Sequence, residues 1–518
     1  MRAPVGNKTR EIVVMALVAV CLVLVSANAA RHYARLDLTR NRMFSISKVS
    51  KDLLASIPQQ VHITYFLSDA LRSLTPAAGR VADLLQEYAA ESRGKVLLTI
   101  LDPDKKGQGE SARRYGILPQ QIQIVQANEQ RTTELYSGIA IDYLDRYTSL
   151  PAVFTPDGLE YSLSFAVRKV LSGRRMVVGV LVGLPGKALG SDFESLRTGL
   201  SRDYTLHEYL VGERIPPEVD MLLVLGGTRW GAPELKAIDS YITGGGKALF
   251  AVKGLEVQTA QSLSAASVGD SPLLDMISSY GVRVGRDMVL DTACRDYRLP
   301  QPQASGQVAW ETIGPYPPWV SVRGPNASAT QPITAGFSGL DLLWPVALTA
   351  AEPEGVHAEA LARTSASAWL QKPPFVIDPY RVSQTGPAQG SPLRGQFVLA
   401  YALSGTFPSR FQAQVRGAPT RIVVVGDDDF LGDLMQFSDS MHNVLFVENC
   451  LLWLSGNADL LTIKTGVGAD GRLDRIQDPA LKGRLMLTAE LLNVVAIPVC
   501  VLAFGLLRRL RRKEKAIP

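Results

Sequence analysis

Cysteine and histidine are scarce in this sequence of 518 residues, which has four cysteines and five histidines. No histidine stands at zinc-ligand spacing from another histidine or a cysteine, so a zinc site is excluded. No cysteine occurs between Cys21 and Cys294, which excludes a thiol oxidoreductase in the first part of the chain. Cys21 and Cys500 lie in apolar runs, so only Cys294 and Cys450 could form a disulfide, and the sequence leaves that pairing open.

The short motifs of nucleotide and serine-hydrolase chemistry are also absent. The chain has no G-x-x-x-x-G-K-[ST] phosphate loop and no G-x-S-x-G elbow. The basic tail from residue 508 carries a net charge of +5, which equals the formal net charge of the whole chain, so the remainder is neutral on balance. We therefore predict no catalytic residue, no cofactor, no bound metal and no nucleic-acid partner.

The longest apolar runs stand near the two ends. Ile12–Ala30 is a run of 19 residues without a charge, and 485–507 is a second run that leads directly into arginines. About 20 apolar residues suffice to cross a bilayer. We expect a membrane-anchored α/β protein with one transmembrane helix at each end. A cleavable signal peptide remains the alternative for the first run, because it ends in Ala27-Asn28-Ala29.

Basic residues beside a span stay in the cytoplasm, so the tail at 508–518 predicts that both termini are cytoplasmic and that 31–484 is periplasmic or otherwise extracytoplasmic, with the chain held in the cytoplasmic (inner) membrane. In the second run, Pro498 and Gly505 permit a kink and close approach to neighbouring helices, which makes them candidates for helix packing. Glu490 is either a functional intramembrane charge or, as we favour, a residue at the outer interface.

Alternation of β-rich and helical segments predicts two α/β regions in the exported part. Residues 60–104 read as strand, helix and strand, and with the following segment they suggest a thioredoxin-like layer. From Val177 onward, strands alternate with helices, which indicates a parallel sheet covered by helices. Gly244-Gly245-Gly246 follow a helix and precede a strand, so they favour a helix cap over a phosphate loop.

Three successive aspartates follow the apolar strand 422–425 and a glycine. Carboxylates at the carboxyl end of a buried parallel strand are where α/β folds place metal or phosphate chemistry. The alternative is that the glycine permits a turn while the aspartates cap the next element and accept backbone amides. No second cluster completes a coordination sphere, which favours capping. The candidate motif of unknown role consists of Gly426, Asp427, Asp428, Asp429, Phe430 and Asn443.

Several further segments occur in a characteristic order and spacing: LDLTRNRMFSIS (36–47), VHITYFLSD, ADLLQEYAAES, GLEYSLSFAVRKVL (158–171), DMLLVLGG, VVVGDDDFLGD and NVLFVENCLLWLSG (443–456). Together they resemble the GldG family, an auxiliary component of ABC-type transport systems first associated with gliding motility. The resemblance covers nearly the whole chain.

The resemblance implies an ABC-2-type permease and a cytoplasmic ATPase as partners, with an envelope cargo and a homo-oligomer as further possibilities. The middle of the chain is similar to class I glutamine-amidotransferase domains and to the related GIFT-type domain of intraflagellar transport proteins. An active enzyme of that kind has a cysteine after the strand KALFAV, where this chain reads Ala251-Val252-Lys253-Gly254. Without a thiolate to attack the amide, a binding scaffold remains.

These patterns predict a non-catalytic auxiliary subunit of an ABC-type transporter. The alternatives are a stand-alone envelope adhesin or ligand-binding protein, and a metal-dependent hydrolase that uses the aspartate cluster. The expected segments are a cytoplasmic N-terminus (1–11), a transmembrane signal anchor (12–30), a thioredoxin-like exported domain (31–150), a connecting helix (151–174), an amidotransferase-like α/β domain (175–300), a loop-rich insertion (301–395), the completion of the α/β domain (396–465), a juxtamembrane linker (466–484), a transmembrane helix (485–507) and a basic cytoplasmic tail (508–518).

Overall fold

A computed structural model gives the structure of the protein. It describes residues 15, 45–105, 108–126, 129–259, 263–302, 308–351, 353–382, 393–412, 417–433 and 441–467. The chain divides into two compact units, Met1–Gly466 and Val467–Pro518. The first unit contains every described residue except Val467, and its elements are described below.

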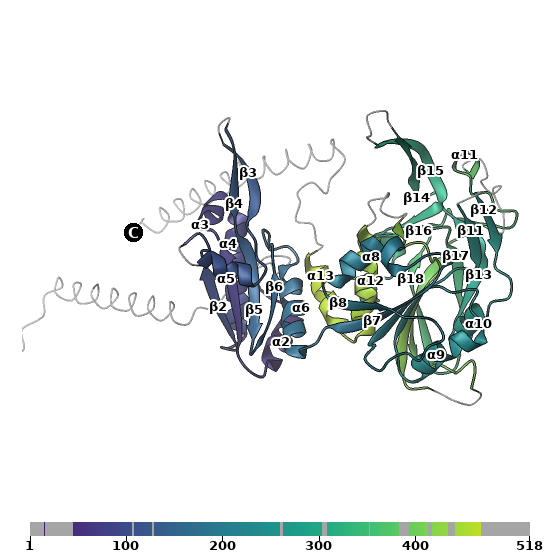
Figure 1. Cartoon of the computed structure of the whole chain (residues 1–518), viewed down its shortest axis with the longest axis horizontal. Helices are drawn as coiled ribbons and strands as arrows, with labels where there is room; N and C mark the ends of the chain where they lie inside the picture. The colour runs from purple at the N-terminus through teal and green to yellow at the C-terminus, as the bar shows by residue number, and fades with distance from the viewer. Residues whose placement is uncertain are drawn as a thin grey trace, which may run out of the picture. The chain divides into compact units, whose positions relative to one another are not determined.

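The N-terminal layer, residues 45–172, is built on a four-stranded sheet in the order β2-β1-β5-β6 (Figure 1). β1 is parallel to β2 and antiparallel to β5, which is antiparallel to β6. The predicted strand, helix and strand over 60–104 are confirmed. The elements are α2 (Lys48–Ser56), β1 (Val61–Leu67), α3 (Asp69–Leu74), α4 (Pro76–Glu91), β2 (Val96–Leu101), α5 (Gln108–Arg114), β3 (Gln120–Gln126), β4 (Glu129–Leu135), β5 (Ser137–Tyr143), β6 (Arg146–Leu150) and α6 (Leu159–Ser172).

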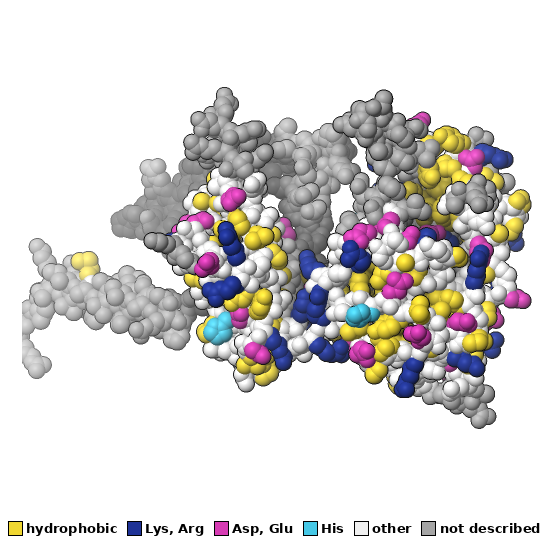
Figure 2. All heavy atoms as spheres, in the orientation of Figure 1, with side chains coloured by type: hydrophobic (Ala, Val, Ile, Leu, Met, Phe, Trp, Pro, Cys, Tyr) yellow, Lys and Arg dark blue, Asp and Glu magenta, His cyan; other side chains and the backbone are white. Residues whose placement is uncertain are grey.

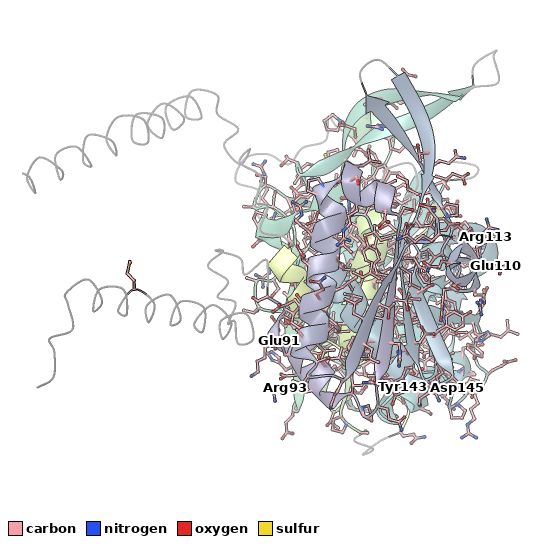
Figure 3. The ribbon with its side chains drawn as sticks, turned by 90° about the vertical axis from the view of Figure 1, so that its left-hand side faces the viewer. Glu91, Arg93, Glu110, Arg113, Tyr143 and Asp145 are labelled. Atoms are coloured by element: carbon pink, nitrogen blue, oxygen red, sulfur yellow. The ribbon has the colours of Figure 1, made fainter. Side chains whose placement is uncertain are left out.

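Helix α4 shows how the sequence forms this layer. Thr75 caps its N-terminus by accepting a hydrogen bond from Ala77 N, and Pro76 fits the first helical position. Its apolar residues recur at helical spacing, so Val81 and Tyr88 are buried on one face. Burying one large apolar side chain stabilises the fold by about 1.5–3 kcal/mol. In Figure 3, Glu91, the last residue of this helix, and Arg93 just after it lie toward the same end of the layer as Tyr143 and Asp145.

The first and last helices of the layer are joined by a buried polar cluster. Glu160 of α6 accepts hydrogen bonds from Ser47 N (2.7 Å) and from Ser50 Oγ (2.6 Å). The Ser50 hydroxyl also lies 2.9 Å from Ser164 Oγ, which in turn lies 3.1 Å from Tyr88 Oη. The described residues 45–47, which precede α2, are therefore joined to α6 here.

The rest of the first unit contains a ten-stranded sheet. The strands β8, β7, β9, β10 and β21 are parallel neighbours in that order, and β20, β17, β13 and β19 continue the sheet antiparallel. All six residues of β9 are buried, as is typical of a parallel strand covered on both faces. The strands are β7 (Met176–Gly183), β8 (Tyr204–Glu208), β9 (Met221–Gly226), β10 (Ala248–Ala251), β13 (Val282–Leu290), β17 (Val346–Ala350), β18 (Val356–Arg363), β19 (Trp369–Gln371), β20 (Val398–Gly405) and β21 (Thr420–Val425).

The remaining elements surround this sheet. The helices are α7 (Leu189–Asp192), α8 (Glu194–Ser201), α9 (Ala232–Thr243), α10 (Pro272–Ser279), α11 (Pro379–Val382), α12 (Met441–Leu454) and α13 (Asp459–Val467), with short 3-10 turns at Gly324–Asn326 and Pro332–Thr334. The smaller strands are β11 (Leu255–Gln258), β12 (Ser264–Ser267), β14 (Cys294–Pro302), β15 (Val308–Val322) and β16 (Leu340–Leu343). On the face shown in Figure 2, basic and acidic side chains are interspersed among the described residues.

Two local predictions can be compared with these elements. Helix α9 ends at Gly244, Gly245 has a φ of +97°, and Gly246 N donates to Tyr241 O, so the triple glycine forms a helix cap as predicted. For the segment 301–395 the composition predicts long surface loops or irregular β structure, and the structure places β15 to β19 there. Proline holds φ in a range compatible with extended backbone, so a proline-rich segment can still form an irregular strand. Cys294 and Cys450 are both free thiols.

The structure corrects the membrane-anchored fold class. It has mixed α/β structure, and among the described residues no helix is long and apolar enough to cross a membrane. The longest described helix, α4, has 16 residues and an amphipathic sequence, whereas a span needs about 20 apolar residues. The segments predicted as spans, 12–30 and 485–507, lie outside the described residues except for Met15. The term thioredoxin-like for the first layer stays a prediction.

Candidate functional site

The carboxyl ends of the parallel strands form one edge of the large sheet. From β7 the chain crosses to β8 on one side, whereas β9 lies on the other side of β7. The direction of the connections thus reverses between β7 and β9. In open α/β sheets, ligands bind in the crevice at such a reversal. The loops that begin at Gly183, Gly226, Val252 and Gly426 meet at this edge.

The crevice between β7 and β9 is filled by the protein itself. A Cβ atom on Gly183 would lie 2.3 Å from Gly227 Cα and 2.6 Å from Trp230 Cζ2. Gly227 has a φ of +97°, and a Cβ there would lie 2.4 Å from the Trp230 ring. The two glycines therefore allow the backbones to touch while the indole packs over both.

The next position along the edge is the turn after β21. Gly426 N donates to Leu399 O and Gly426 O accepts from Val346 N, both at 2.8 Å, so the glycine is held between two neighbouring strands. A Cβ on Gly426 would lie 2.4 Å from Val346 O. Any larger residue would push this backbone apart, which explains the glycine before the aspartates.

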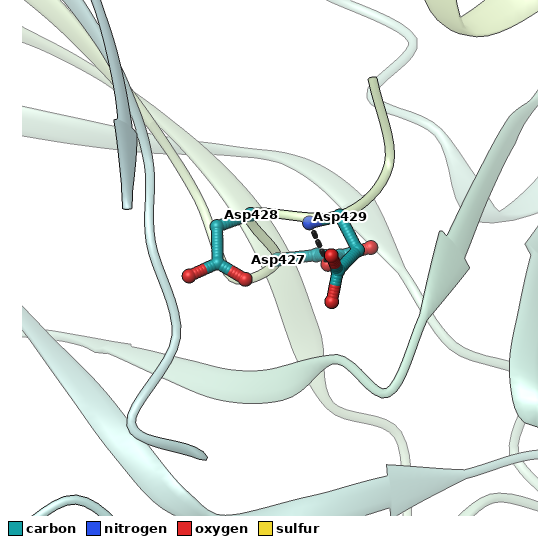
Figure 4. Close-up of side chains that lie close together, drawn as sticks. All are labelled: Asp427, Asp428 and Asp429. Carbon is teal, nitrogen blue, oxygen red and sulfur yellow. Dashed lines mark hydrogen bonds between the residues drawn. The ribbon is translucent and has the colours of Figure 1, made fainter. Parts of the chain in front are cut away.

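Asp427 shapes the turn with both of its carboxylate oxygens. Its Oδ1 accepts from Asp429 N at 2.8 Å, as Figure 4 shows, and its Oδ2 accepts from Leu343 N at 2.7 Å. The side chain is fully buried. The first bond closes a local turn and the second joins the turn to β16, which is the type of backbone bonding that the capping interpretation describes.

Lys253, which follows β10, supplies the opposing charge. Its ammonium lies 2.9 Å from Asp428 Oδ1 and 3.8 Å from Asp427 Oδ1, and it donates to Asp429 Oδ2. Lys187, from the loop after β7, lies 3.0 Å from the other oxygen of Asp429. The Lys253 side chain is 3% exposed and the Lys187 side chain 30%, so the cluster holds three buried carboxylates, one buried ammonium and one partly exposed ammonium.

Burial and charge act in opposite directions on these groups. Burial raises the pKa of Asp427 to about 7 and the pKa of Asp428 to about 6, although Lys253 opposes both changes. Burial acts in the same sense on Asp429, but Lys253 and Lys187 outweigh it and lower the pKa of Asp429 to about 2. Burial alone would lower the pKa of Lys253, and the three carboxylates raise it above its usual range. Lys253 is therefore charged at neutral pH.

The same carboxylates have some features of a metal site. Each offers one oxygen, and these oxygens lie within 4.8 Å of one another. Oxygen ligands of this kind suit Mg²⁺ or Ca²⁺. The Lys253 ammonium already lies among them, so a divalent cation in that position would have to displace a buried positive charge. The cluster is organised around lysine.

Asn443, at the start of α12, completes the arrangement. Its Oδ1 accepts from Asp341 N at 2.9 Å, and its Nδ2 donates to Asp341 O and to Phe430 O, both at 2.8 Å. The side chain thus joins β16, the aspartate turn and α12, while Phe430 is buried in the core. The structure brings all six residues of the candidate motif together.

Sequence reasoning missed the two lysines of the cluster. Lys253 was noted only as the residue near a missing cysteine, and Lys187 was not singled out. The available signal was the order of the strands: β10 and β21 are parallel neighbours, so a lysine after one and aspartates after the other must meet. The other candidates, Glu490, Pro498 and Gly505, lie outside the described residues.

Comparison with known proteins gives a family and several similarities. Residues 175–450 match the family described as "ABC-type uncharacterized transport system", and residues 40–142 match a domain of unknown function. An uncharacterized protein of Borreliella burgdorferi is 22% identical, over 98% of this chain and 99% of that protein. A solved structure described as "mmIFT52 N-terminal domain" has a TM-score of 0.33 at 15% identity, covering 54% of this chain and 97% of its own. A ThuA-like protein from Parabacteroides merdae has a TM-score of 0.27 at 10% identity, covering 54% of this chain and 90% of its own.

The fold and the site define an α/β protein whose usual ligand positions at the strand ends are occupied by its own side chains. The family match covers more than half of the chain. The chain belongs to the ABC-type uncharacterized transport system family, and this membership fits an auxiliary role in ABC-type transport.

Proposed function

We propose that this protein is a non-catalytic auxiliary subunit of an ABC-type transporter, and that its folded domains bind a cargo or an envelope partner. An ABC-2-type permease and a cytoplasmic ATPase would be separate chains, since this sequence has no phosphate loop. The family membership supports the auxiliary role. The choice of a binding scaffold over an enzyme rests on the side chains at the carboxyl ends of the parallel strands.

The observation that carries this choice is the buried position of Lys253. In an amidotransferase-like domain the turn after β10 would present a nucleophile to solvent, whereas here a lysine points into the protein and pairs with Asp428 and Asp429. An ammonium held by buried carboxylates stays protonated and cannot attack a substrate. Trp230 fills the neighbouring crevice in the same way.

The finer assignment is part of the same proposal. The five parallel strands support an amidotransferase-like or GIFT-type α/β domain that has lost the catalytic cysteine. The GldG-like assignment is supported by the order and spacing of the resembling segments in the sequence. It does not extend to gliding motility.

Affinity purification tests the proposed partners. A tagged full-length chain, expressed at its natural level and extracted in mild detergent, should recover one permease and one ATPase of the ABC type. An untagged strain controls for background. The variant Lys187→Met keeps the buried Lys253 and should recover the same partners. Recovery of neither protein above background contradicts the auxiliary role.

The extracytoplasmic placement of residues 31–484 also stays a proposal, and it rests only on the sequence patterns at the two ends. A reporter that works only in the cytoplasm should be inactive when fused near Asp270, which lies between β12 and α10. The same reporter fused to a cytoplasmic protein is the control. Full activity of the Asp270 fusion would place the domains in the cytoplasm.

A further inference from the structure

A cavity of about 580 Å³ lies beside strand β6, the last strand of the N-terminal sheet. Its lining includes every residue of 147–155, together with residues of α6 and of the region that contains the large sheet. Ligand sites have volumes of roughly 300–1,000 Å³ and often lie where two folded regions meet. Successive residues of a strand point to opposite faces, so a cavity lined by all of 147–150 lies along the edge of β6.

Two residues of β6 direct their backbone groups toward this cavity. The hairpin from β5 to β6 has a two-residue turn, so the flanking residues Tyr143 and Arg146 form a hydrogen-bonded pair. Alternation along the ladder then directs the backbone of Thr148 toward β5 and that of Tyr147 and Ser149 outward. In the described part of the chain, β6 pairs only with β5. Tyr147 and Ser149 therefore each offer one N–H and one C=O at the cavity.

Another wall of the cavity belongs to the same chain, which limits what can enter. Arg175, Arg202 and Glu448 line it, from the segments before β7 and β8 and from α12. An ion pair joins α6 to this wall, since Lys169 Nζ lies 3.1 Å from Asp203 Oδ1. The space between β6 and this wall suits one extended segment rather than the folded sheet of a second copy.

The side chains of the cavity favour a partly apolar ligand with little net charge. Tyr161 and Phe165 of α6 line it and stack with their ring centroids 6.2 Å apart. The charged residues of the lining balance one another, with Lys169, Arg175 and Arg202 against Asp157, Asp203 and Glu448. A lining without net charge does not attract strongly anionic ligands such as nucleotides. It suits a polypeptide, whose backbone carries donors and acceptors complementary to those of β6.

We propose that an extended segment of a partner protein binds in this cavity as an additional strand on β6. Its backbone exchanges hydrogen bonds with Tyr147 and Ser149, roughly four in all, and its side chains on the α6 side contact Tyr161 and Phe165. Because side chains alternate along a strand, the segment has apolar residues at every second position and little net charge. This inference deepens the proposed binding role, and it rests on that proposal in assigning the segment to the cargo or envelope partner.

Selection on the purified full-length chain from a phage-displayed library of random linear dodecapeptides supplies the probe. Enriched peptides should have apolar residues at alternate positions. Fluorescence anisotropy then measures the binding of one enriched, labelled peptide to the wild-type chain, Ser149→Pro and Ser149→Ala. Proline removes the outward N–H but is tolerated in edge strands, so Ser149→Pro should weaken binding by about tenfold or more. The matched control Ser149→Ala keeps the N–H and should bind the peptide as tightly as the wild-type chain.

Methylation of the peptide backbone tests the pairing without changing the protein. Two versions of the peptide carry N-methyl groups on alternate residues, and the second set is shifted by one residue from the first. Only one set replaces the N–H groups that face β6, so one version should lose binding and the other should keep it. Thermal unfolding shows whether each protein variant is folded, and the methylated pair decides if Ser149→Pro is not.

The inference is overturned if the selection enriches no peptide, if folded Ser149→Pro binds as tightly as Ser149→Ala, or if the two methylated peptides bind equally well. Affinity purification of the permease and ATPase is a separate measurement, and folded Ser149→Pro should still recover both. Peptide binding without recovery of these partners would contradict the transporter role alone. Recovery of both partners without peptide binding would contradict only the strand addition at β6.

Discussion

Lys253 Nζ and Asp428 Oδ1 lie 2.9 Å apart, with side chains only 3% and 5% exposed. The two residues follow different strands and are brought together only because β10 and β21 are parallel neighbours. The Lys253 charge is tolerated in the interior because carboxylates surround it. The ion cluster thus holds together the turns at the carboxyl ends of these strands, and substitutions in it should change the stability of the protein.

Replacing Lys253 by methionine should destabilise the protein by about 3–5 kcal/mol, because the apolar side chain keeps most of the volume but leaves buried carboxylates without their counter-charge. Urea unfolding of the two proteins measures the difference. Lys187→Met is the matched control. Lys187 is 30% exposed and contacts the same Asp429, so the loss should be at most about 1 kcal/mol. Equal losses for the two variants would show that Lys253 has no special role.

Two neighbouring aspartates, Asp428 and Asp429, should contribute to the free energy of unfolding with opposite pH dependence. The pKa of Asp429 is lowered to about 2, so its contribution to stability is present above the unfolded value near 3.8 and is lost as pH falls through about 2. Asp429→Asn should therefore destabilise the protein at pH 7, by about 2 kcal/mol, and should have no effect on stability at low pH.

The pKa of Asp428 is raised to about 6, so the contribution of Asp428 to stability is complete below about 3.8 and is lost as pH rises through 6. Asp428→Asn should be more stable than wild type at pH 8.

Chemical unfolding of these two variants at pH 3, 5 and 8 provides the measurement. Each variant is the control for the other, since both remove one carboxylate from the same cluster. Parallel pH profiles for the two variants would contradict the opposite shifts of the two pKa values.

Divalent cations should not bind at the aspartate turn at micromolar concentration, because the Lys253 ammonium already lies among the carboxylates. Titration calorimetry of the full-length chain with Mg²⁺ and with Ca²⁺ measures this. Micromolar binding that disappears in Asp427→Ala or Asp429→Ala would revive the metal-dependent hydrolase interpretation.

Gly227→Ala should destabilise the protein more than Gly186→Ala. Both glycines have positive φ, at +97° and +71°, so both substitutions strain the backbone. Only at Gly227 does the new methyl group collide with the Trp230 ring, at 2.4 Å, whereas nothing lies within 4 Å of a Cβ on Gly186. We expect about 1 kcal/mol for Gly186→Ala and about 2 kcal/mol more for Gly227→Ala, from overpacking. A thermal unfolding series checks the difference, and equal losses would contradict the filled crevice.

The regular part of the fold follows from local patterns in the sequence. The apolar strands β7, β9 and β21 and the helices α4 and α9 have the periodicity and caps that predict them. Within 301–395 the sequence predicts loops or irregular β structure but not the bounds or pairing of the strands, because pairing partners lie far apart in the sequence and proline and glycine mask the alternation. The transmembrane ends were inferred from hydropathy alone, and the structure does not support that part of the prediction.

Only the aspartate side of the candidate site could be predicted from the sequence, because the residues that it contacts lie far away along the chain. Aspartates after a buried strand are visible in the sequence, and so is the glycine that precedes them. Lys253, which neutralises them, precedes Asp427 by 174 positions in the sequence. The role of this lysine can be recognised only when the order of the strands is known. Asn443 was part of the candidate motif without an assigned role, and its three hydrogen bonds explain why an amide is needed there.

The link between α2 and α6 has a mechanical consequence. The chain enters the N-terminal layer at Ser47 and leaves it after Ser172, and Ser47 is tied directly to Glu160 near the start of α6. Tension applied along the backbone passes from Ser47 into α6 and out along the helix axis, a length of about 21 Å at 1.5 Å per residue. The β-sheet lies outside this path. A pulling force along the backbone would therefore load the contacts of Ser47 and Ser50 with Glu160 before the paired strands, and the strands would bear the load only after these contacts had broken.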